Sequence, residues 1–348
     1  MKPTFLILMI LFFVSCKNNP QEVQQANLQG ENLSLDKSIL LGSPFKVRIS
    51  GSFLFILDNK APNGYFVNIY SYPDLRYIVS AGAHGEGPEE LLGAGSLDVD
   101  ERFLYLFDIS KARLFKYALD DLKEEMNSPK EIIQFPNQLI PVLAYAKTSA
   151  GFMFLQFSPE GGCFIETNEQ GEILEKKEKM PFYNRNYKAL SDPRFIPALW
   201  QSYLDFDERE KIAVAATQLG EVLEVYSIKK DTILVSVGKG DLPGLLQIPS
   251  GFSIGKVTGF SDVKIADHKI YAVYSGADRK ELMEAHQKGL TVPNGGNYLL
   301  VYNKEGEMTH RYPLDRFVSS IDIDLKKRLI IAIDPNNEEH PLCTFTLQ

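Results

Sequence analysis

Cysteine, histidine and long apolar runs are scarce in this sequence. Its 348 residues include three cysteines and five histidines. A small disulfide-stapled scaffold needs more cysteines than this. No two histidines have the H-x-H or H-x-x-x-H spacing of common zinc sites, and the G-x-S-x-G string of many serine hydrolases is missing. These absences exclude a disulfide framework, a local zinc motif and a nucleophile elbow.

Basic clusters and long amphipathic helices are also missing. The chain carries 37 Lys and Arg residues against 45 Asp and Glu residues, a net charge of −8. An acidic chain without a basic patch argues against a nucleic-acid partner. The hydrophobic content of 44%, with 11% aromatic residues, predicts a packed core rather than disorder.

The first residues have the organisation of an export signal. Lys2 precedes an apolar run over residues 5–14, and Ser15 and Cys16 follow. The run is shorter than the roughly 20 residues that cross a bilayer. A cysteine after a small residue resembles the lipobox of bacterial lipoproteins, so we expect lipidation of Cys16; the alternative is an ordinary signal with an incidental cysteine. The predicted division is a signal peptide (1–15), a flexible lipid-anchored tether (16–31) and one domain (32–348).

Beyond Cys16 the sequence has only Cys163 and Cys343. One disulfide between them and two buried thiols are both compatible with the sequence.

Strand patterns recur along the whole domain. A short apolar run ending in Asp, a polar turn and an alternating run occur at 53–72, 103–119 and 328–347, and weaker copies fill the rest. The turn positions are 58, 108, 158, 216, 275 and 334, at intervals of 50 to 59 residues. Six such units, each long enough for four short strands, predict an all-β fold, a six-bladed β-propeller with four-stranded blades.

The ends and insertions of the repeat lead to two further predictions. The last unit has only three strands, so the segment 32–41 is expected to supply its outer strand and close the ring. Irregular segments at 180–198, 238–256 and 276–296, the last with a short helix, are expected at the ends of the channel, where binding residues concentrate.

The chain resembles a known family, the TolB-like six-bladed propeller lipoproteins of Bacteroidetes, which are similar to NHL-repeat propellers. The resemblance rests on Cys16, on the strands LFILD (54–58) and LYLFD (104–108), and on the glycine-rich loop 81–95. In the family this loop has a GPGE-like string, whereas here Glu89 replaces its second glycine. The resemblance implies the fold and an envelope location more than an activity.

Three sets of candidate site residues follow from the sequence, each with a structural alternative. His84 lies in the glycine-rich loop, which either cradles an anion or simply makes a tight turn. Flat aromatic rings and planar donors suited to a glycan or peptide gather at Tyr183, Arg185, Tyr187, Arg194 and Trp200. The recurring Asp58, Asp108 and Asp334 would hold Ca²⁺ if they were axial, or else fix their turns through backbone N–H groups.

Two function classes remain open from the sequence. The preferred one is a non-catalytic binding or scaffold lipoprotein for a glycan, a peptide or an envelope protein. The alternative is a propeller enzyme, such as a calcium-dependent lactonase or a lyase. Only Glu22 is acidic between Cys16 and residue 30, so we expect an outer-membrane anchor facing the periplasm. Three or more grouped carboxylates or imidazoles at the axis would favour the enzyme.

Overall fold

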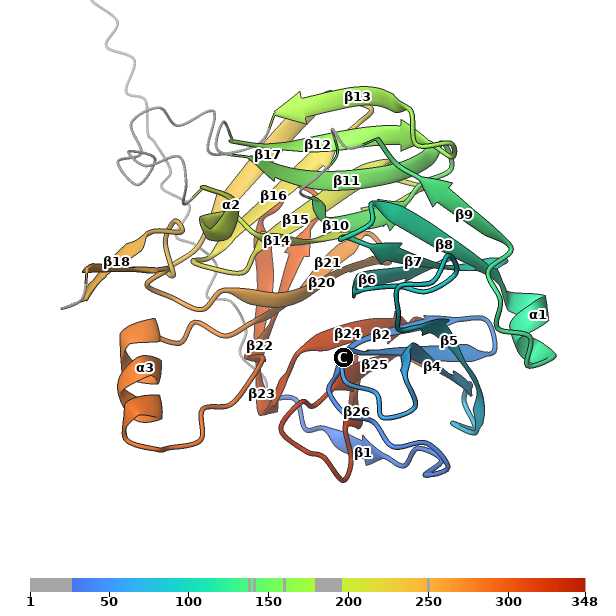
Figure 1. The fold of residues 1–348 in the computed structure, drawn as a ribbon. Coiled ribbons are helices and arrows are strands. Elements are labelled where there is room, and N and C mark those ends of the chain that lie inside the picture. Colours follow the sequence, from blue (N-terminus) through green and yellow to red (C-terminus); the bar gives the residue numbers. More distant parts are fainter. Residues whose placement is uncertain are drawn as a thin grey trace, which may run out of the picture.

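The protein is a six-bladed β-propeller (Figure 1). The computed structural model describes residues 27–136, 139, 142–158, 161–178, 196–248 and 251–347. Six four-stranded antiparallel sheets follow one another along the chain, and the innermost strands of neighbouring blades are in contact all the way round. The predicted fold class and blade number are confirmed.

Blades one to three use consecutive strands, and in each blade the first strand is the innermost and the last is the outermost. Blade one contains β2 (Pro44–Ser50), β3 (Phe53–Asp58), β4 (Tyr65–Ser71) and β5 (Tyr77–Ala83). Blade two contains β6 (Ala94–Val99), β7 (Phe103–Asp108), β8 (Arg113–Ala118) and β9 (Glu131–Gln134), with helix α1 (Leu119–Lys123) before β9. Blade three contains β10 (Val142–Lys147), β11 (Gly151–Ser158), β12 (Gly161–Asn168) and β13 (Ile173–Glu178).

Blades four to six carry the insertions and the closure. Blade four contains β14 (Ser202–Asp207), β15 (Ile212–Thr217), β16 (Val222–Ser227) and β17 (Thr232–Val237), preceded by helix α2 (Ile196–Leu199). Blade five contains β20 (Phe260–Ala266), β21 (Lys269–Tyr274), β22 (Gly296–Asn303) and β23 (Met308–Val318), with helix α3 (Arg279–Gln287) between β21 and β22. Blade six contains β24 (Ser320–Asp324), β25 (Leu329–Ile333), β26 (Leu342–Thr346) and β1 (Glu31–Leu33). A separate hairpin is formed by β18 (Leu245–Ile248) and β19 (Gly251–Ile254).

The second strand of each blade reads as a continuous apolar run because both of its faces are covered. Every residue of β3 and of β15 is buried. The predicted turn positions fall at the ends of these second strands or one residue from them, in all six blades. The period derived from the sequence therefore follows the real blade period.

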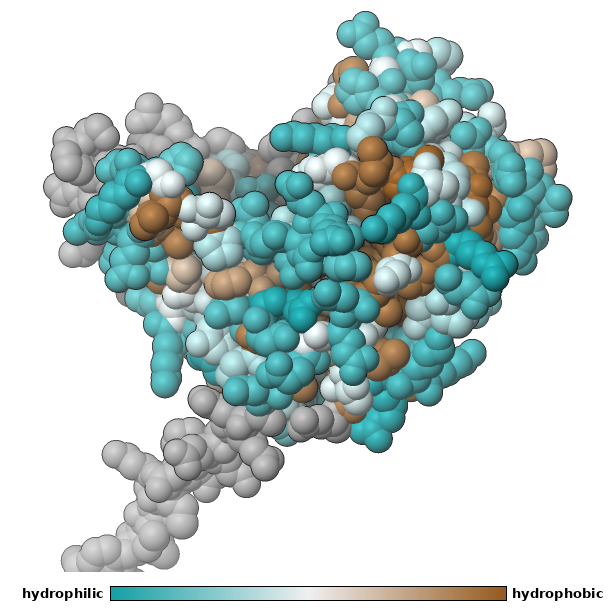
Figure 2. All heavy atoms as spheres, turned by 90° about the horizontal axis from the view of Figure 1, so that it is seen from below, coloured by the Kyte–Doolittle hydropathy of each residue, from teal (hydrophilic) through white to brown (hydrophobic). Residues whose placement is uncertain are grey.

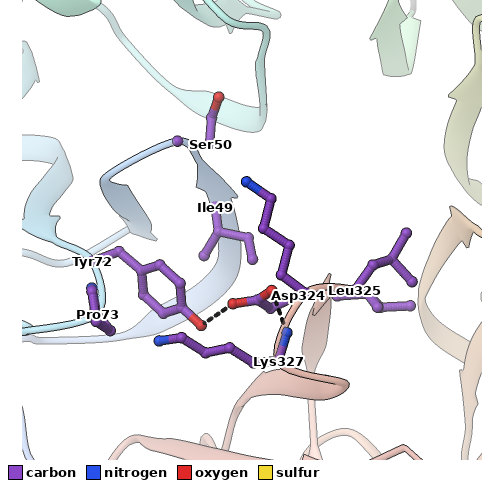
Figure 3. Close-up of a pocket in the computed structure, with 10 residues that line it drawn as sticks. Ile49, Ser50, Tyr72, Pro73, Asp324, Leu325 and Lys327 are labelled. Atoms are coloured by element: carbon purple, nitrogen blue, oxygen red, sulfur yellow. Dashed lines mark hydrogen bonds between the residues drawn. The ribbon is translucent and has the colours of Figure 1, made fainter.

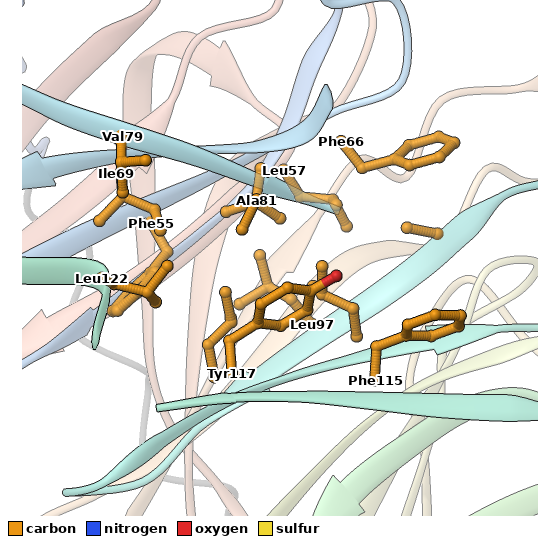
Figure 4. Packing of buried hydrophobic residues seen from close by; sticks show 14 of the residues in the cluster. Phe55, Leu57, Phe66, Ile69, Val79, Ala81, Leu97, Phe115, Tyr117 and Leu122 are labelled. Atoms are coloured by element: carbon orange, nitrogen blue, oxygen red, sulfur yellow. The ribbon is translucent and has the colours of Figure 1, made fainter. Parts of the chain in front are cut away.

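Buried apolar side chains form one cluster at each of the six blade interfaces. Figure 4 shows the cluster between blades one and two, where Phe55 and Leu57 of β3 lie opposite Leu97 of β6 and Tyr117 of β8. Each sheet therefore hides its two faces against its neighbours, and burial of this apolar area stabilises the ring as a whole.

The N-terminal strand closes the ring as predicted. Asn32 of β1 pairs with Cys343 of β26, antiparallel. The strand is shorter than the predicted 32–41, because the chain turns away after Leu33. Leu28 is 5% exposed and bridges to Leu314 of β23, so packing begins inside the span predicted as tether.

The insertions lie at one end of the channel. We call this end the loop face and define it by the starts of the innermost strands, such as Pro44, Ala94 and Phe260. The α2 segment, the β18–β19 hairpin and α3 all lie on this side, at the left of Figure 1, whereas α1 lies on the opposite side, the α1 face. The sequence placed the insertions at the ends of the channel without choosing between them, and their described parts lie at one of the two ends.

Candidate functional site

The channel wall carries a repeated contact between blades. Four innermost strands each contain an aspartate whose Oδ2 accepts a hydrogen bond from a backbone N–H of a neighbouring innermost strand. The pairs are Asp98 with Lys147 (2.6 Å), Asp205 with Ile265 (2.6 Å), Asp262 with Ile321 (3.1 Å) and Asp322 with Ile49 (2.7 Å). These carboxylates join successive blades at the axis.

Two buried cations, Lys46 and Arg48, and the half-buried Lys264 accompany these aspartates. Lys264 Nζ lies 3.0 Å from Asp205 Oδ1, and Arg48 Nη1 lies 3.3 Å from Asp262 Oδ2. Burial alone would raise the pKa of Asp262, but Lys46, Arg48 and a hydrogen bond from Ser320 outweigh it and lower this pKa to about 2. Charge in the channel is therefore largely compensated within the protein.

The predicted calcium residues do not meet. Asp58, Asp108 and Asp334 belong to blades one, two and six and accept hydrogen bonds from the backbone of their own turns. Asp58 also accepts from the N–H groups of Gly42 and Ser43, at 2.7 Å each. Across the described ranges no group of three or more His, Cys, Asp and Glu side chains could hold a metal ion. These contacts do not fit Ca²⁺; they are those of the turn-fixing alternative.

His84 and its loop are held by the loop's own carboxylate. The His84 side chain is exposed, with its ring 5.5 Å from that of Phe66. Glu90 Oε2 accepts a hydrogen bond from Gly87 N at 2.8 Å, and a Cβ on Gly85 would collide with the same carboxylate. The glycines therefore surround Glu90, which takes the place that an anion would need.

Trp200 is not a surface platform, which corrects the prediction from the sequence. Its side chain is fully buried in the cluster between blades three and four, together with Leu199 and Leu204. A ring packed in the core cannot stack on a ligand. The other predicted members of this set, Tyr183, Arg185, Tyr187 and Arg194, lie outside the described residues, as does Cys16.

A cavity of about 320 Å³ opens at the loop-face end of the channel. Residues in or directly beside the innermost strands of all six blades line it. They include Lys46, Ser96, Ala144, Tyr203, Asp262 and Ser319. Gln201 and Gln218 complete its polar wall. Because the cavity lies on the axis, one ligand there would contact every blade.

Several polar side chains in this axial cavity are uncommitted, that is, they make no hydrogen bond to other described residues. Within the described residues, the side chains of Gln201, Tyr203 and Gln218 make no hydrogen bond to the protein, although all three line the cavity. Uncompensated donors and acceptors in a concave site are what a polar ligand needs for orientation. The axial cavity is therefore our candidate functional site.

A second cavity, of about 410 Å³, lies on the α1 face between blades one and six (Figure 3). Here the polar groups are already paired: the Tyr72 hydroxyl donates to Asp324 Oδ2 at 2.7 Å, and the Lys327 N–H donates to Oδ1 at 3.0 Å. The Lys327 ammonium also lies 4.5 Å from the centre of the Tyr72 ring. This cavity offers fewer open polar groups than the axial one.

A third hollow lies against α3 and is mostly apolar. Leu282, Met283 and Val292 line it. In Figure 2 the lobe at the left, where α3 lies in Figure 1, has a small brown area among hydrophilic side chains. Arg279, His286 and Gln287 of α3 complete its lining.

The comparisons with known proteins agree with this geometry. A family model described as TolB-like 6-blade propeller-like matches residues 23–326, most of the chain. The chain belongs to the TolB-like six-bladed propeller family. No curated protein matches this TolB-like propeller. In its described part, no helix combines the length and apolar composition that crossing a membrane requires.

Solved structures similar to this TolB-like propeller include two from Bacteroides. One is a protein of Bacteroides fragilis whose name assigns it to export, with 14% identity, 92% of this chain and 94% of that chain covered, and a TM-score of 0.54. The other is a DUF4221 family member from Bacteroides vulgatus, with 9% identity, 94% and 97% covered, and a TM-score of 0.52. At these identities the likeness extends to the fold alone.

Sequence reasoning missed the axial residues. Lys46 and Arg48 alternate with apolar residues in β2 and look like the exposed side of a strand, yet both are buried. One signal was present: an apolar–Asp–apolar–Asp string recurs at 97–100, 204–207 and 321–324. Its first Asp is each time the carboxylate that joins two blades.

Proposed function

We propose that this propeller is a non-catalytic binding protein of the cell envelope, with its ligand in the axial cavity on the loop face. The observation that carries this proposal is the set of uncommitted polar side chains in a cavity lined by all six blades. The family and fold support a binding or scaffold role in general. A glycan, a peptide or a segment of an envelope protein are the ligand classes that such a wall suits.

The charged groups of the channel favour binding over catalysis. Four axial aspartates exceed the number that would have suggested an enzyme, but each accepts a backbone hydrogen bond from another blade. Of these four, Asp262 lines the cavity, and its low pKa keeps it ionised. A general acid or base needs a pKa nearer the working pH and a free path to the substrate.

A screen with a blocked cavity tests this proposal. The mature wild-type protein and the variant Gln218→Trp are each applied to glycan and peptide arrays. The larger Trp side chain fills the cavity, and replacing Gln218 removes no side-chain hydrogen bond among the described residues. The matched control is Gln170→Trp, at an exposed turn of the α1 face. We expect a ligand that binds wild type and the control alike and binds Gln218→Trp about tenfold more weakly or worse. Equal binding by all three proteins would place the site elsewhere.

We further propose that the protein is exported and anchored through a lipid on Cys16, in the outer membrane and facing the periplasm. The signal-like N-terminus and the name of the Bacteroides fragilis relative support export. Cys16→Ser should move the protein from the membrane fraction to the soluble fraction of cells and abolish incorporation of a labelled fatty acid. Membrane association that survives this substitution would contradict the anchor.

A further inference from the structure

Lys46 is a buried ammonium without a hydrogen-bond acceptor. Its side chain is 8% exposed, and it lines the axial cavity. Its ion-pair contact is with Asp262 Oδ1, at 3.6 Å, which is too long for a hydrogen bond. Among the described residues no other acceptor reaches Nζ. Three strong donors therefore face the cavity with nothing to receive them.

Asp262 is already occupied by other groups. Its Oδ2 accepts from Arg48 (3.3 Å), Ser320 (2.5 Å) and Ile321 N (3.1 Å), and its Oδ1 accepts from Val263 N (3.0 Å). These bonds hold the carboxylate against the channel wall and away from Lys46. A buried cation that lacks its full set of hydrogen bonds is costly, and an anionic group on a ligand would supply the missing acceptor.

We propose that Lys46 is the anchor for a carboxylate on the ligand of the axial cavity. The inference rests on the proposed binding function and names the ligand's chemistry. Gln201, Gln218 and Tyr203 would meet hydroxyl or amide groups on the same molecule. A cavity of about 320 Å³ suits a body the size of one sugar or one or two amino acids. The ligand class is thus a sugar acid or the carboxyl end of a peptide.

The surroundings of Lys46 make such binding sensitive to pH. The charged groups that act on it are Arg48 on its own strand, Asp205 on β14, and Asp262 and Lys264 on β20. Asp98 on β6 and Asp322 on β24 act on the neighbouring Arg48. Burial, with repulsion from Arg48, lowers the pKa of Lys46 to about 8. Above that pH the free protein presents a neutral amine, so affinity for a carboxylate falls as the pH rises.

Matched pairs of probes test the carboxylate. Sodium D-glucuronate is compared with D-glucose, and an acetylated dialanine with a free carboxylate is compared with its amide, by titration calorimetry. Wild type should bind at least one carboxylate about tenfold or more tightly than its neutral counterpart, the scale of a charge-assisted hydrogen bond. Which pair shows the difference tells a sugar acid from a peptide end.

Variants of Lys46 supply the second arm. Lys46→Met should remove the preference for the carboxylate, and Lys46→Arg should keep it and extend it to higher pH because Arg stays charged. Lys326→Met removes the same charge on the exposed α1 face and should change nothing. If Lys46→Met does not fold, the wild-type loss of preference between about pH 7 and about pH 9.5 decides the question.

The outcomes separate this inference from the proposed function. A preference that survives in Lys46→Met, or that is absent from wild type, overturns the carboxylate anchor. If neutral probes bind as well as their acids and Gln218→Trp abolishes both, the anchor is wrong and the binding function stands. If Gln218→Trp leaves carboxylate binding unchanged, both are wrong.

Discussion

Charged side chains at the propeller axis are largely buried and contact groups on other strands. Arg48 illustrates this, since its Nη1 bonds to Asp262 and to the carbonyl oxygens of Val47 and Ile321. A single guanidinium therefore contacts blades one, five and six. Breaking such a pair from one side leaves a buried charge without compensation, which costs more than the pair itself contributes.

We expect Asp262→Asn to lower the free energy of unfolding by about 3–5 kcal/mol, because Arg48 and Lys46 would lose their common counter-charge. Burial raises the pKa of Asp98, so its ionised form is less favoured. Asp98→Asn should therefore cost only about 1–2 kcal/mol. Urea unfolding measures both. Equal losses would contradict the special role of Asp262.

The Asp262 pKa of about 2 also predicts acid sensitivity. Its folded-state pKa lies below the unfolded value of about 3.9, so its contribution is present above that pH and is lost as the pH falls toward 2. As the pH falls from about 4 toward 2, Asp262→Asn should therefore lose less stability than wild type does. Circular dichroism during an acid titration would record this.

Lys46 predicts a second rise of stability with pH, in the basic range. Its folded-state pKa of about 8 is below the value of about 10.4 expected when unfolded. The unfolded chain binds more protons between these values, so wild-type stability should rise from about pH 8 to about pH 9.5. Lys46→Met should show no such rise in urea unfolding. A Lys46→Met curve parallel to wild type would show that other groups are responsible.

Single residues were also where the sequence was least informative. Trp200 follows a segment (180–198) rich in Tyr, Arg, Asn and Pro, yet its ring fills the interface of blades three and four. The aspartate contacts at the axis join residues 49 to 273 positions apart, and nothing local in the sequence specifies such partners. Burial of Lys46 follows from the ring around it, not from its strand.

At the scale of strands and helices, prediction from the sequence worked well. The repeated runs expected at 53–72, 103–119 and 328–347 contain β3 and β4, β7 and β8, and β25 and β26, and the helix expected within 276–296 is α3. Apolar runs bounded by turn residues are local signals, so strands can be recognised from them without knowledge of the fold. Cys163 and Cys343 lie in β12 and β26 of different blades and do not form a disulfide with each other.

One outer strand lacks the charges that usually protect a sheet edge. In β17 the side chains of Leu234, Val235 and Val237 are 45%, 39% and 47% exposed, and the strand contains no charged residue. The outer strand β13, in contrast, contains two Glu and two Lys residues. An uncharged apolar edge is a template for pairing with another chain.

We therefore expect Val235→Lys to reduce concentration-dependent self-association, because a charge on the edge opposes strand pairing. Its effect on stability should stay within about 0.5 kcal/mol, as for most surface changes. Sedimentation velocity over a concentration series measures the association. The control is Leu174→Lys on the charged β13 edge, which should leave association unchanged; an equal decrease there would implicate overall charge.

For the whole molecule, closure decides stability. Six interfaces share the burial of apolar area, and the one between blades six and one depends on the first strand of the chain. Arg316 of β23, in blade five, holds the segment before this strand through a hydrogen bond from Nη2 to the Gly30 carbonyl at 2.6 Å. Removing this strand exposes β26 and opens the array.

A chain that begins at residue 34 should lose about 3–5 kcal/mol of stability relative to one that begins at residue 27, because it lacks β1 and the buried Leu28. Its thermal midpoint should fall and it should aggregate through the exposed edge. Leu28→Ala in the longer chain should account for about 2–3 kcal/mol of this loss. Identical melting of the two truncated chains would mean that closure contributes little.

The closing strand has a mechanical consequence if Cys16 carries a lipid. Leu28 is twelve positions after Cys16, a span that reaches at most about 40 Å when extended. Any drag on the body relative to the membrane would load the bridge of Leu28 with Leu314 and then the three-residue pairing of β1 with β26, before any other part of the molecule. Tension on the tether would then first detach the N-terminal strand from the outer edge of blade six, rather than unfold a whole blade.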